Sequence, residues 1–186
     1  PLIYYSLKVA NQVVSKKNIY VSSDSFAIKK IANTYGVNFI QRPKKLASST
    51  SSEFLSWKHA VLNLYQKKIK FDIFVSLPAT SPLRSKIDVL KTINKKNKQN
   101  DIVLTASKSC RNPYFNIVEK KSNGFYDTVA KKKNVVRRQS APKTFDLNTV
   151  AFVTTPEYII KSKAIFEGRV AINLIPIERS LDIDSS

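Results

Sequence analysis

Two carboxylates lie two residues apart near the end of this chain, at Asp182 and Asp184. In an extended segment, side chains at that spacing point to the same face. Paired hard oxygen ligands suit a Mg²⁺ ion that bridges the phosphates of a nucleotide. The alternative interpretation is an exposed acidic pair or a helix cap. Because the chain holds only 13 acidic residues, the pair gains weight as a candidate metal site.

Polar side chains that suit a nucleotide follow three segments that we expect to be consecutive strands. Each is also compatible with ordinary turn and capping chemistry, for example with Asp24 as a helix N-cap. Together, at the ends of neighbouring strands, they predict a cleft. The candidates are Ser22, Asp24, Arg42, Thr80, Ser81 and Arg84.

The densest arginine site is Arg137-Arg138-Gln139, which is followed by Asp146 and Asn148. A guanidinium can bind phosphate or carboxylate with two parallel hydrogen bonds, so this segment is a candidate anion clamp. The competing interpretation is a solvated basic turn. Arg138, Gln139 and Asn148 are therefore candidate substrate-binding residues, and Arg138 is also a candidate catalytic residue.

The composition excludes several classes of site. The three glycines are far apart, so no glycine-rich phosphate loop is present, and Cys110 has no Cys/His cluster around it with zinc spacing. His59 shares a helical stripe with Leu55 and Leu62 and is interpreted as a packed core residue rather than a base. No apolar run reaches about 18 residues, so no membrane span is expected and the protein is predicted to be cytoplasmic.

The net charge of +19 raises a polyanion partner as an alternative. A basic nucleic-acid-binding module would use such a charge, but the lysines form short runs without the interleaved aromatic residues of RNA-binding segments. The simpler interpretation is a lysine-rich solvated surface. The acidic pair separates the two hypotheses, since a polyanion binder has no use for carboxylates in its cleft.

Apolar periodicity alternates between helical and extended segments along most of the chain. Residue 71 to residue 77 is a nearly continuous apolar run, which is typical of a strand covered on both faces and therefore central and parallel. Helices are expected at 2–14, 24–35, 52–65, 87–96 and 156–161, and strands at 19–22, 37–40, 71–77, 101–107, 114–119, 124–126, 145–154 and 170–175.

This alternation predicts one domain over residues 1–186 of the α/β class, with a doubly wound, mostly parallel, Rossmann-like sheet. Residues 112–150 change character and predict a small antiparallel β excursion inserted near the end. Ligands in such folds lie at the carboxyl ends of the strands, where the polar loops are expected. Because the chain has no Met and opens at Pro1, its beginning is expected to be missing.

Six short motifs occur in an order that resembles the acylneuraminate cytidylyltransferase family, the CMP-sialic acid synthetases. The resemblance covers essentially the whole chain. The motifs are Pro1-Leu2-Ile3-x-Tyr5-Ser6-Leu7, Val21-Ser22-Ser23-Asp24, Arg42-Pro43-x-x-Leu46-Ala47, Thr80-Ser81-Pro82-Leu83-Arg84, Arg138-Gln139-x-x-Pro142 and Asp182-Ile183-Asp184.

The resemblance implies a nucleotide-diphospho-sugar transferase fold and a reaction. The anomeric hydroxyl of a nine-carbon, sialic-acid-like sugar acid would attack the α-phosphorus of CTP, with Mg²⁺ as cofactor and pyrophosphate as leaving group. By the same resemblance, Asp182 and Asp184 are metal ligands, and Arg42 and Ser52 contact the nucleotide. Arg138 and Gln139 belong to the sugar side or to a neighbouring subunit's site, because family members are dimers in which the excursion reaches across. A catalytically dead relative remains an alternative.

The sequence departs from the family pattern in several places. The first strand and its basic CTP loop are absent, a glutamine is replaced by Pro78, an aspartate by Ser49, and Asn-Gly-Ala reads Asn148-Thr149-Val150. In the family the first strand lies between the strands that correspond here to 19–22 and 71–77. We therefore expect unpaired strand edges, low stability and little turnover in this chain, all rescued by upstream sequence.

Overall fold

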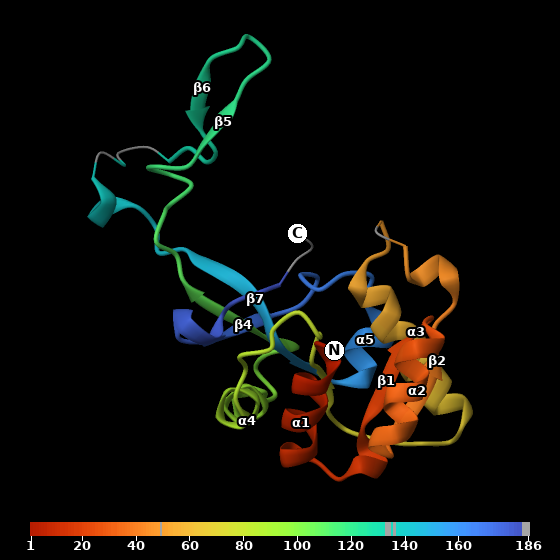
Figure 1. Ribbon diagram of the computed structural model, residues 1–186. Helices are drawn as coiled ribbons and strands as arrows, with labels where there is room; N and C mark the ends of the chain where they lie inside the picture. The colour runs from red at the N-terminus through yellow and green to blue at the C-terminus, as the bar shows by residue number, and fades with distance from the viewer. Residues whose placement is uncertain (49, 133–134, 136, 184–186) are drawn as a thin grey trace.

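The computed structural model describes residues 1–48, 50–132, 135 and 137–183 (Figure 1). The helices are α1 (Ile3–Val13), α2 (Phe26–Tyr35), α3 (Glu53–Gln66), α4 (Lys86–Lys95) and α5 (Pro156–Lys161). The strands are β1 (Tyr20–Ser23), β2 (Asn38–Gln41), β3 (Phe74–Ser76), β4 (Ile102–Lys108), β5 (Val118–Lys120), β6 (Tyr126–Thr128), β7 (Phe145–Thr154) and β8 (Val170–Leu174).

The strands of the main body form two sheets. β1 pairs in parallel with β2, and a second sheet has the order β3-β7-β4-β8. Within it β4 and β8 are parallel, whereas β7 runs antiparallel to both β3 and β4. The expectation that the apolar run at 71–77 forms a parallel strand was wrong. Only Phe74–Ser76 is extended, and its partner comes from β7, a return strand far along the chain that local hydrophobicity does not reveal.

The two sheets form a single layer, because α1 packs against strands of both sheets on one face and α3 does so on the other face. Neighbouring residues of β7 point to opposite faces: Ala151 packs in a cluster with Val9 of α1 and Val89 of α4, whereas Phe152 packs with Trp57 of α3. β1 alternates in the same way, because Val21 packs with Leu7 of α1 and Tyr20 packs against the α3 side.

A cavity of about 730 Å³ lies in this layer between β1 and β3. Residues of both strands line it, and side chains from α1 and α3 close its two faces, among them Leu7, Trp57 and Leu64. Within the described part of the chain, β1 pairs only with β2 and β3 only with β7. Each strand therefore presents one backbone edge without a strand partner to the same apolar space. We call this space the slot.

Most helix ends follow the sequence signals. Gly36 ends α2 with φ +66°, the left-handed conformation in which glycine is favoured, and Ser52 caps α3 by accepting a hydrogen bond from Phe54 N. The cap of α2 was assigned wrongly to Asp24. Ser25 is the N-cap and accepts from Ile28 N, because the helix begins one residue later, at Phe26.

The stripe of α3 was also assigned to the wrong face. Leu55 and Leu62 are exposed, and the buried face instead carries the residues Phe54, Trp57, Val61 and Leu64. His59 is half-buried between the two faces, and its Nδ1 is buried with no hydrogen-bond partner among the described residues.

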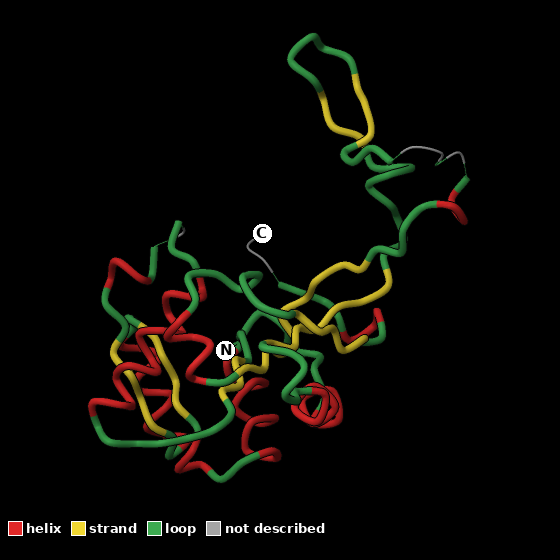
Figure 2. Tube along the Cα trace, turned by 180° about the vertical axis from the view of Figure 1, so that it is seen from behind, coloured by secondary structure: helices red, strands yellow, loops and turns green. Residues whose placement is uncertain are grey.

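An arm extends from the far end of β4 and β7, and both views show it reaching away from the body (Figures 1 and 2). Its tip is the antiparallel hairpin of β5 and β6. The strand predicted from residue 114 begins only at Val118, because Asn112 Oδ1 accepts from Tyr114 N and folds the preceding segment into a turn. Phe125 and Tyr126 at the hairpin are 74% and 66% exposed.

None of the described helices is long and apolar enough to cross a bilayer.

Candidate functional site

An irregularity in β7 creates the centre of the candidate site. The register with β4 jumps between Leu104, which faces Phe152, and Thr105, which faces Asn148. The Thr105 hydroxyl lies inside this bulge, 3.0 Å from both the amide and the carbonyl oxygen of Ala151. Because the bulged residues leave the ladder, Thr149 is directed out of the sheet toward the loop that follows β3.

The loop after β3 and the C-terminal segment meet at Thr149. Its Oγ1 lies 2.6 Å from Ser81 Oγ and 3.0 Å from Thr80 Oγ1, and it donates to Asp182 Oδ1 at 2.9 Å. A backbone hydrogen bond from Ile183 N to Thr80 O, at 2.8 Å, fixes the same junction. The structure thus brings Asp182 together with Thr80 and Ser81, which lie about a hundred residues earlier in the sequence.

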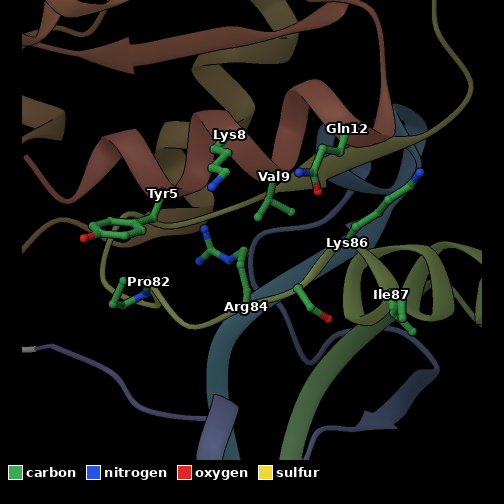
Figure 3. Close-up of a pocket in the computed structure, with 9 residues that line it drawn as sticks. Tyr5, Lys8, Val9, Gln12, Pro82, Arg84, Lys86 and Ile87 are labelled. Carbon is green, nitrogen blue, oxygen red and sulfur yellow. The ribbon is translucent and has the colours of Figure 1, made fainter.

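Arg84 ties this loop to its surroundings. Its side chain is 4% exposed and projects toward α1 beside Tyr5, Lys8 and Val9 (Figure 3). The guanidinium donates to Ser6 Oγ at 2.5 Å, to Thr149 O at 3.0 Å and to Pro78 O. Burial lowers the pKa of Arg84 to about 10, partly offset by the charge of Asp182. The prediction that Arg84 binds the nucleotide is therefore not supported. Its buried guanidinium instead holds the loop after β3 in place through these hydrogen bonds.

Asp88 and Arg179 anchor the segment that leads to Asp182. Asp88 closes a capping box with Ser85 at the start of α4, and Arg179 donates from Nε and Nη2 to its two carboxylate oxygens at 2.9 and 3.0 Å. Burial opposes ionisation of this carboxyl, but the hydrogen bonds from Arg179 and Ser85 outweigh it and lower the pKa of Asp88. Arg179 lies three residues before Asp182, so the pair sets the path of the C-terminal segment.

We expect the Asp88–Arg179 pair to stabilise the folded protein at neutral pH and to lose this contribution in acid. Because the folded pKa is below the unfolded value, about 3.9, the contribution is present above that value and is lost as pH falls through the folded pKa. Thermal melts between pH 2 and 6 should show a fall in Tm below about pH 4 that is smaller in Asp88→Asn. Equal acid sensitivity of the two proteins would contradict this assignment. Asp146→Asn, at an exposed residue of β7, is the matched control.

Arg42 and Ser22 join the ends of the first two strands. Arg42 Nη2 donates to Ser22 O at 2.7 Å, and its Nε donates to Ser22 Oγ at 3.3 Å. Because β1 and β2 are parallel, both residues lie at the same edge of the sheet. Both also line the slot near its end. The sequence prediction that Ser22 and Arg42 lie together is confirmed.

Glu53 is a residue that sequence reasoning missed. Its Oε1 accepts from Trp57 Nε1 at 3.1 Å and from Ser76 Oγ at 3.2 Å, and it lines the slot. Loss of solvent around the carboxylate raises its pKa; the hydrogen bonds and the charge of Arg42 act in the opposite direction, and the charge of Asp182 raises it further. Glu53 thus lies within electrostatic range of both halves of the candidate site. A lone glutamate after a capping serine gave no sequence signal of this.

Other predicted site residues take different places. Asp24 is exposed, and its backbone carbonyl accepts from Gln41 Nε2. Ser52 acts as a helix cap, and Asn148 is 6% exposed with no hydrogen-bond partner for its Nδ2 among the described residues. Asp184 lies outside the described residues, as does Ser49. The structure therefore supports a cluster around Asp182 and a second around Arg42, with Asn148 buried behind the first.

Arg138 and Gln139 lie apart from this cluster. They form part of a short 3-10 helix, η3 (Arg138–Ser140), on the arm, where both are exposed. Arg138 Nη2 donates to Cys110 O at 2.7 Å. Within one copy of the chain, Figure 1 shows the segment that carries η3 apart from the C-terminal segment. The expectation that they act on the sugar side or across subunits stays a prediction.

The oxygen ligands around Asp182 fit a magnesium ion better than a transition metal. Among the described residues, no group of three or more His, Cys, Asp or Glu side chains could hold a metal ion by itself. Magnesium is usually held by one or two carboxylates together with substrate phosphates and water, so the half-buried Asp182 carboxylate is compatible with it.

Comparison with known proteins decides the family. The sequence profile of a family described as cytidylyltransferase matches residues 1–174. The chain belongs to this family. Asp182 lies just beyond the matched residues, whereas Ser22, Arg42, Glu53 and Thr149 lie within them. The predicted relationship to the cytidylyltransferases is confirmed.

Two similar proteins with curated names extend over nearly all of this cytidylyltransferase. The post-translational flagellin modification protein B of Campylobacter coli is 32% identical over 187 residues, which cover 99% of this chain and 79% of the relative. The CMP-N,N'-diacetyllegionaminic acid synthase of Campylobacter jejuni is 30% identical with the same coverage.

Solved structures confirm the predicted α/β fold class. A CMP:2-keto-3-deoxy-manno-octonic acid synthetase in complex with CTP matches 94% of this chain and 80% of its own length, with a TM-score of 0.60 and 12% identity. A 4-diphosphocytidyl-2C-methyl-D-erythritol synthase from Anaerococcus prevotii matches 98% of this chain and 82% of its own, with a TM-score of 0.63 and 16% identity. At this identity the likeness concerns the fold alone.

Proposed function

We propose that this cytidylyltransferase transfers CMP from CTP to a nonulosonic sugar acid in a magnesium-dependent reaction that releases pyrophosphate. The observation that supports it best is the position of Asp182. Its carboxylate accepts a hydrogen bond from Thr149 next to the loop that follows β3. One of the two curated relatives points to the sugar class, since it is named as a CMP-N,N'-diacetyllegionaminic acid synthase. We also propose the cytoplasm as its location, because CTP is made there.

The reaction is a displacement at the α-phosphorus of CTP. The sugar hydroxyl oxygen forms a bond to that phosphorus, the bond to the bridging oxygen of the β-phosphate breaks, and the hydroxyl proton is released. Such a step needs alignment and charge stabilisation more than covalent help from the protein. Mg²⁺, when bound, neutralises phosphate charge. In this scheme Asp182 holds the cation, and Arg42 and Ser22 contact the nucleotide at the ends of β1 and β2.

We propose that the arm serves a homodimer. Its exposed residues Phe125 and Tyr126 offer an apolar contact that one copy leaves uncovered, and Arg138 and Gln139 lie on the same arm. A second copy would allow these polar side chains to reach a site that they do not reach in their own chain. Light scattering of Phe125→Ser against the parent protein would measure this, with a shift toward the monomer as the expected result.

The function is tested by pyrophosphate release with CTP and a panel of sugar acids. We expect Mg²⁺-dependent release with at least one nonulosonic acid, such as N,N'-diacetyllegionaminic or N-acetylneuraminic acid, and none after chelation by EDTA. Formation of the CMP-sugar is followed in parallel by chromatography. Absence of product with every sugar, both from this chain and from a version of it extended upstream of Pro1, would contradict the proposal. Steeply salt-dependent DNA binding that ignores CTP and Mg²⁺ would instead indicate a nucleic-acid-binding module.

A further inference from the structure

We propose that Thr149 is a positioning residue that orients the Asp182 carboxylate for cation binding, an inference that rests on the proposed function. The hydroxyl of Thr149 is the meeting point of three other oxygen atoms, from Thr80, Ser81 and Asp182. The sequence alone marked residue 149 only as a departure from the family pattern.

The hydrogen atoms of this cluster can be assigned by valence. An ionised carboxylate only accepts, so the single proton of the Thr149 hydroxyl points to Asp182 Oδ1 at 2.9 Å. The two lone pairs of Thr149 Oγ1 then accept from Ser81 at 2.6 Å and from Thr80 at 3.0 Å. In this assignment each of the three hydroxyl protons, from Thr149, Ser81 and Thr80, has one acceptor. Ser81 is fully buried, and among the described residues the proton of its hydroxyl finds an acceptor only in this arrangement.

The backbone around Thr149 supports the same role. The β7 bulge directs the side chain out of the ladder, and Arg84 holds its carbonyl oxygen at 3.0 Å from a buried guanidinium. Thr149 is therefore fixed from both sides before it meets Asp182. By contrast, Asp182 is on a segment without regular secondary structure, so its side-chain direction depends on the contacts that it makes.

Thr149 is the only hydrogen-bond donor to the Asp182 carboxylate among the described residues. Its bond goes to Oδ1 and leaves Oδ2 without a hydrogen-bond partner in the same part of the chain. A carboxylate held in this way presents one oxygen in a fixed direction, as a cation ligand requires. Removal of an outer partner of a metal ligand typically costs about 10–100-fold in metal affinity or activity.

Two substitutions separate the hydroxyl from the bulk of the side chain. Thr149→Ser keeps the donor, and Thr149→Val keeps the volume but removes it. The probe is Mn²⁺ alone, titrated into the 186-residue chain and followed by the EPR signal of the free ion. We expect Thr149→Val to weaken Mn²⁺ binding by about 10–100-fold and Thr149→Ser to stay within about threefold of the parent. Thr149→Ala, which cannot clash, is the second variant if Thr149→Val does not fold.

The outcomes separate this inference from the function on which it rests. If Thr149→Val and Thr149→Ser bind Mn²⁺ alike, whether as the parent or equally weakened, the hydroxyl does not position Asp182 and the inference fails. A parent chain that binds no Mn²⁺ also overturns it, because Asp182 then holds no cation. Neither result decides whether CMP is transferred to a sugar, which the pyrophosphate and CMP-sugar measurements test separately.

Discussion

Replacement of Asp182 by asparagine is expected to reduce CMP transfer by about 10³-fold, close to the detection limit of a pyrophosphate assay. Asparagine keeps the shape and can still accept from Thr149, but it removes the negative charge that would hold the cation. Metal ions contribute several kcal/mol to stabilisation of phosphoryl charge, and about 4 kcal/mol corresponds to this factor. The loss should appear mainly in kcat, because the remaining contacts to the nucleotide stay.

Asp146→Asn is the matched control for this prediction. Asp146 belongs to the same strand as Thr149, is exposed, and accepts from Ser109 Oγ at 2.5 Å on the arm side of β7. Its replacement removes an equal charge at a position with no hydrogen bond to the cluster around Asp182, so turnover should change by less than about threefold. Equal melting temperatures for the parent and both variants would show that folding is unaffected. Full activity of Asp182→Asn would remove Asp182 from the mechanism.

The second large effect is expected from filling the slot between β1 and β3. We expect a version extended before Pro1 by five alternating valine and isoleucine residues and a short polar turn to melt at a temperature about 10 °C higher. Pro1 lines the slot, so a strand joined to α1 can enter there. A strand that leads into α1 and lies beside β1 forms a βαβ unit, in which the two strands are parallel.

The size of the effect follows from burial and pairing. Five fully buried aliphatic side chains contribute about 1.5–3 kcal/mol each, and ordering the backbone costs about 1–2 kcal/mol per residue. Hydrogen bonds to two strand edges add about 1 kcal/mol each. A net gain of a few kcal/mol shifts Tm by roughly 2–4 °C per kcal/mol at this chain length.

The control for the slot is an extension of equal length built from serine, glycine and asparagine. It has the same connection to α1 but little apolar surface, so we expect no change in Tm. Turnover should rise together with stability in the apolar version, because Ser22, Glu53 and Ser76 all line the slot and would gain a fixed neighbour. Identical melting curves for the two extensions would show that the slot does not accept a strand. A 186-residue chain that already turns over CTP as fast as the extended one would contradict the expected gain in activity.

The amino-acid sequence predicted elements wherever a local signal is sufficient. β7 and α5 have the predicted bounds, and Gly36 and Ser52 end and begin their helices as expected, because a left-handed cap and a side-chain cap depend on one or two residues. The cap of α2 was missed by one residue, since Asp24 and Ser25 are both suitable caps. The short apolar run around β3 was wrongly predicted to be a parallel strand, because the hydrophobic pattern of a segment carries no information on its partner strand.

For the site, the sequence alone determined the family, the polar loops at the strand ends and the candidate role of Asp182. Tertiary structure decided which of these residues meet. Thr149 and Glu53 reach the site through a strand bulge and through contacts with Ser76 and Trp57, and Arg84 turns out to be a buried brace. The physical reason is that side-chain chemistry is a local property of the sequence. Its direction and its partners instead depend on how distant strands pair, and pairing is settled only when the whole layer is assembled.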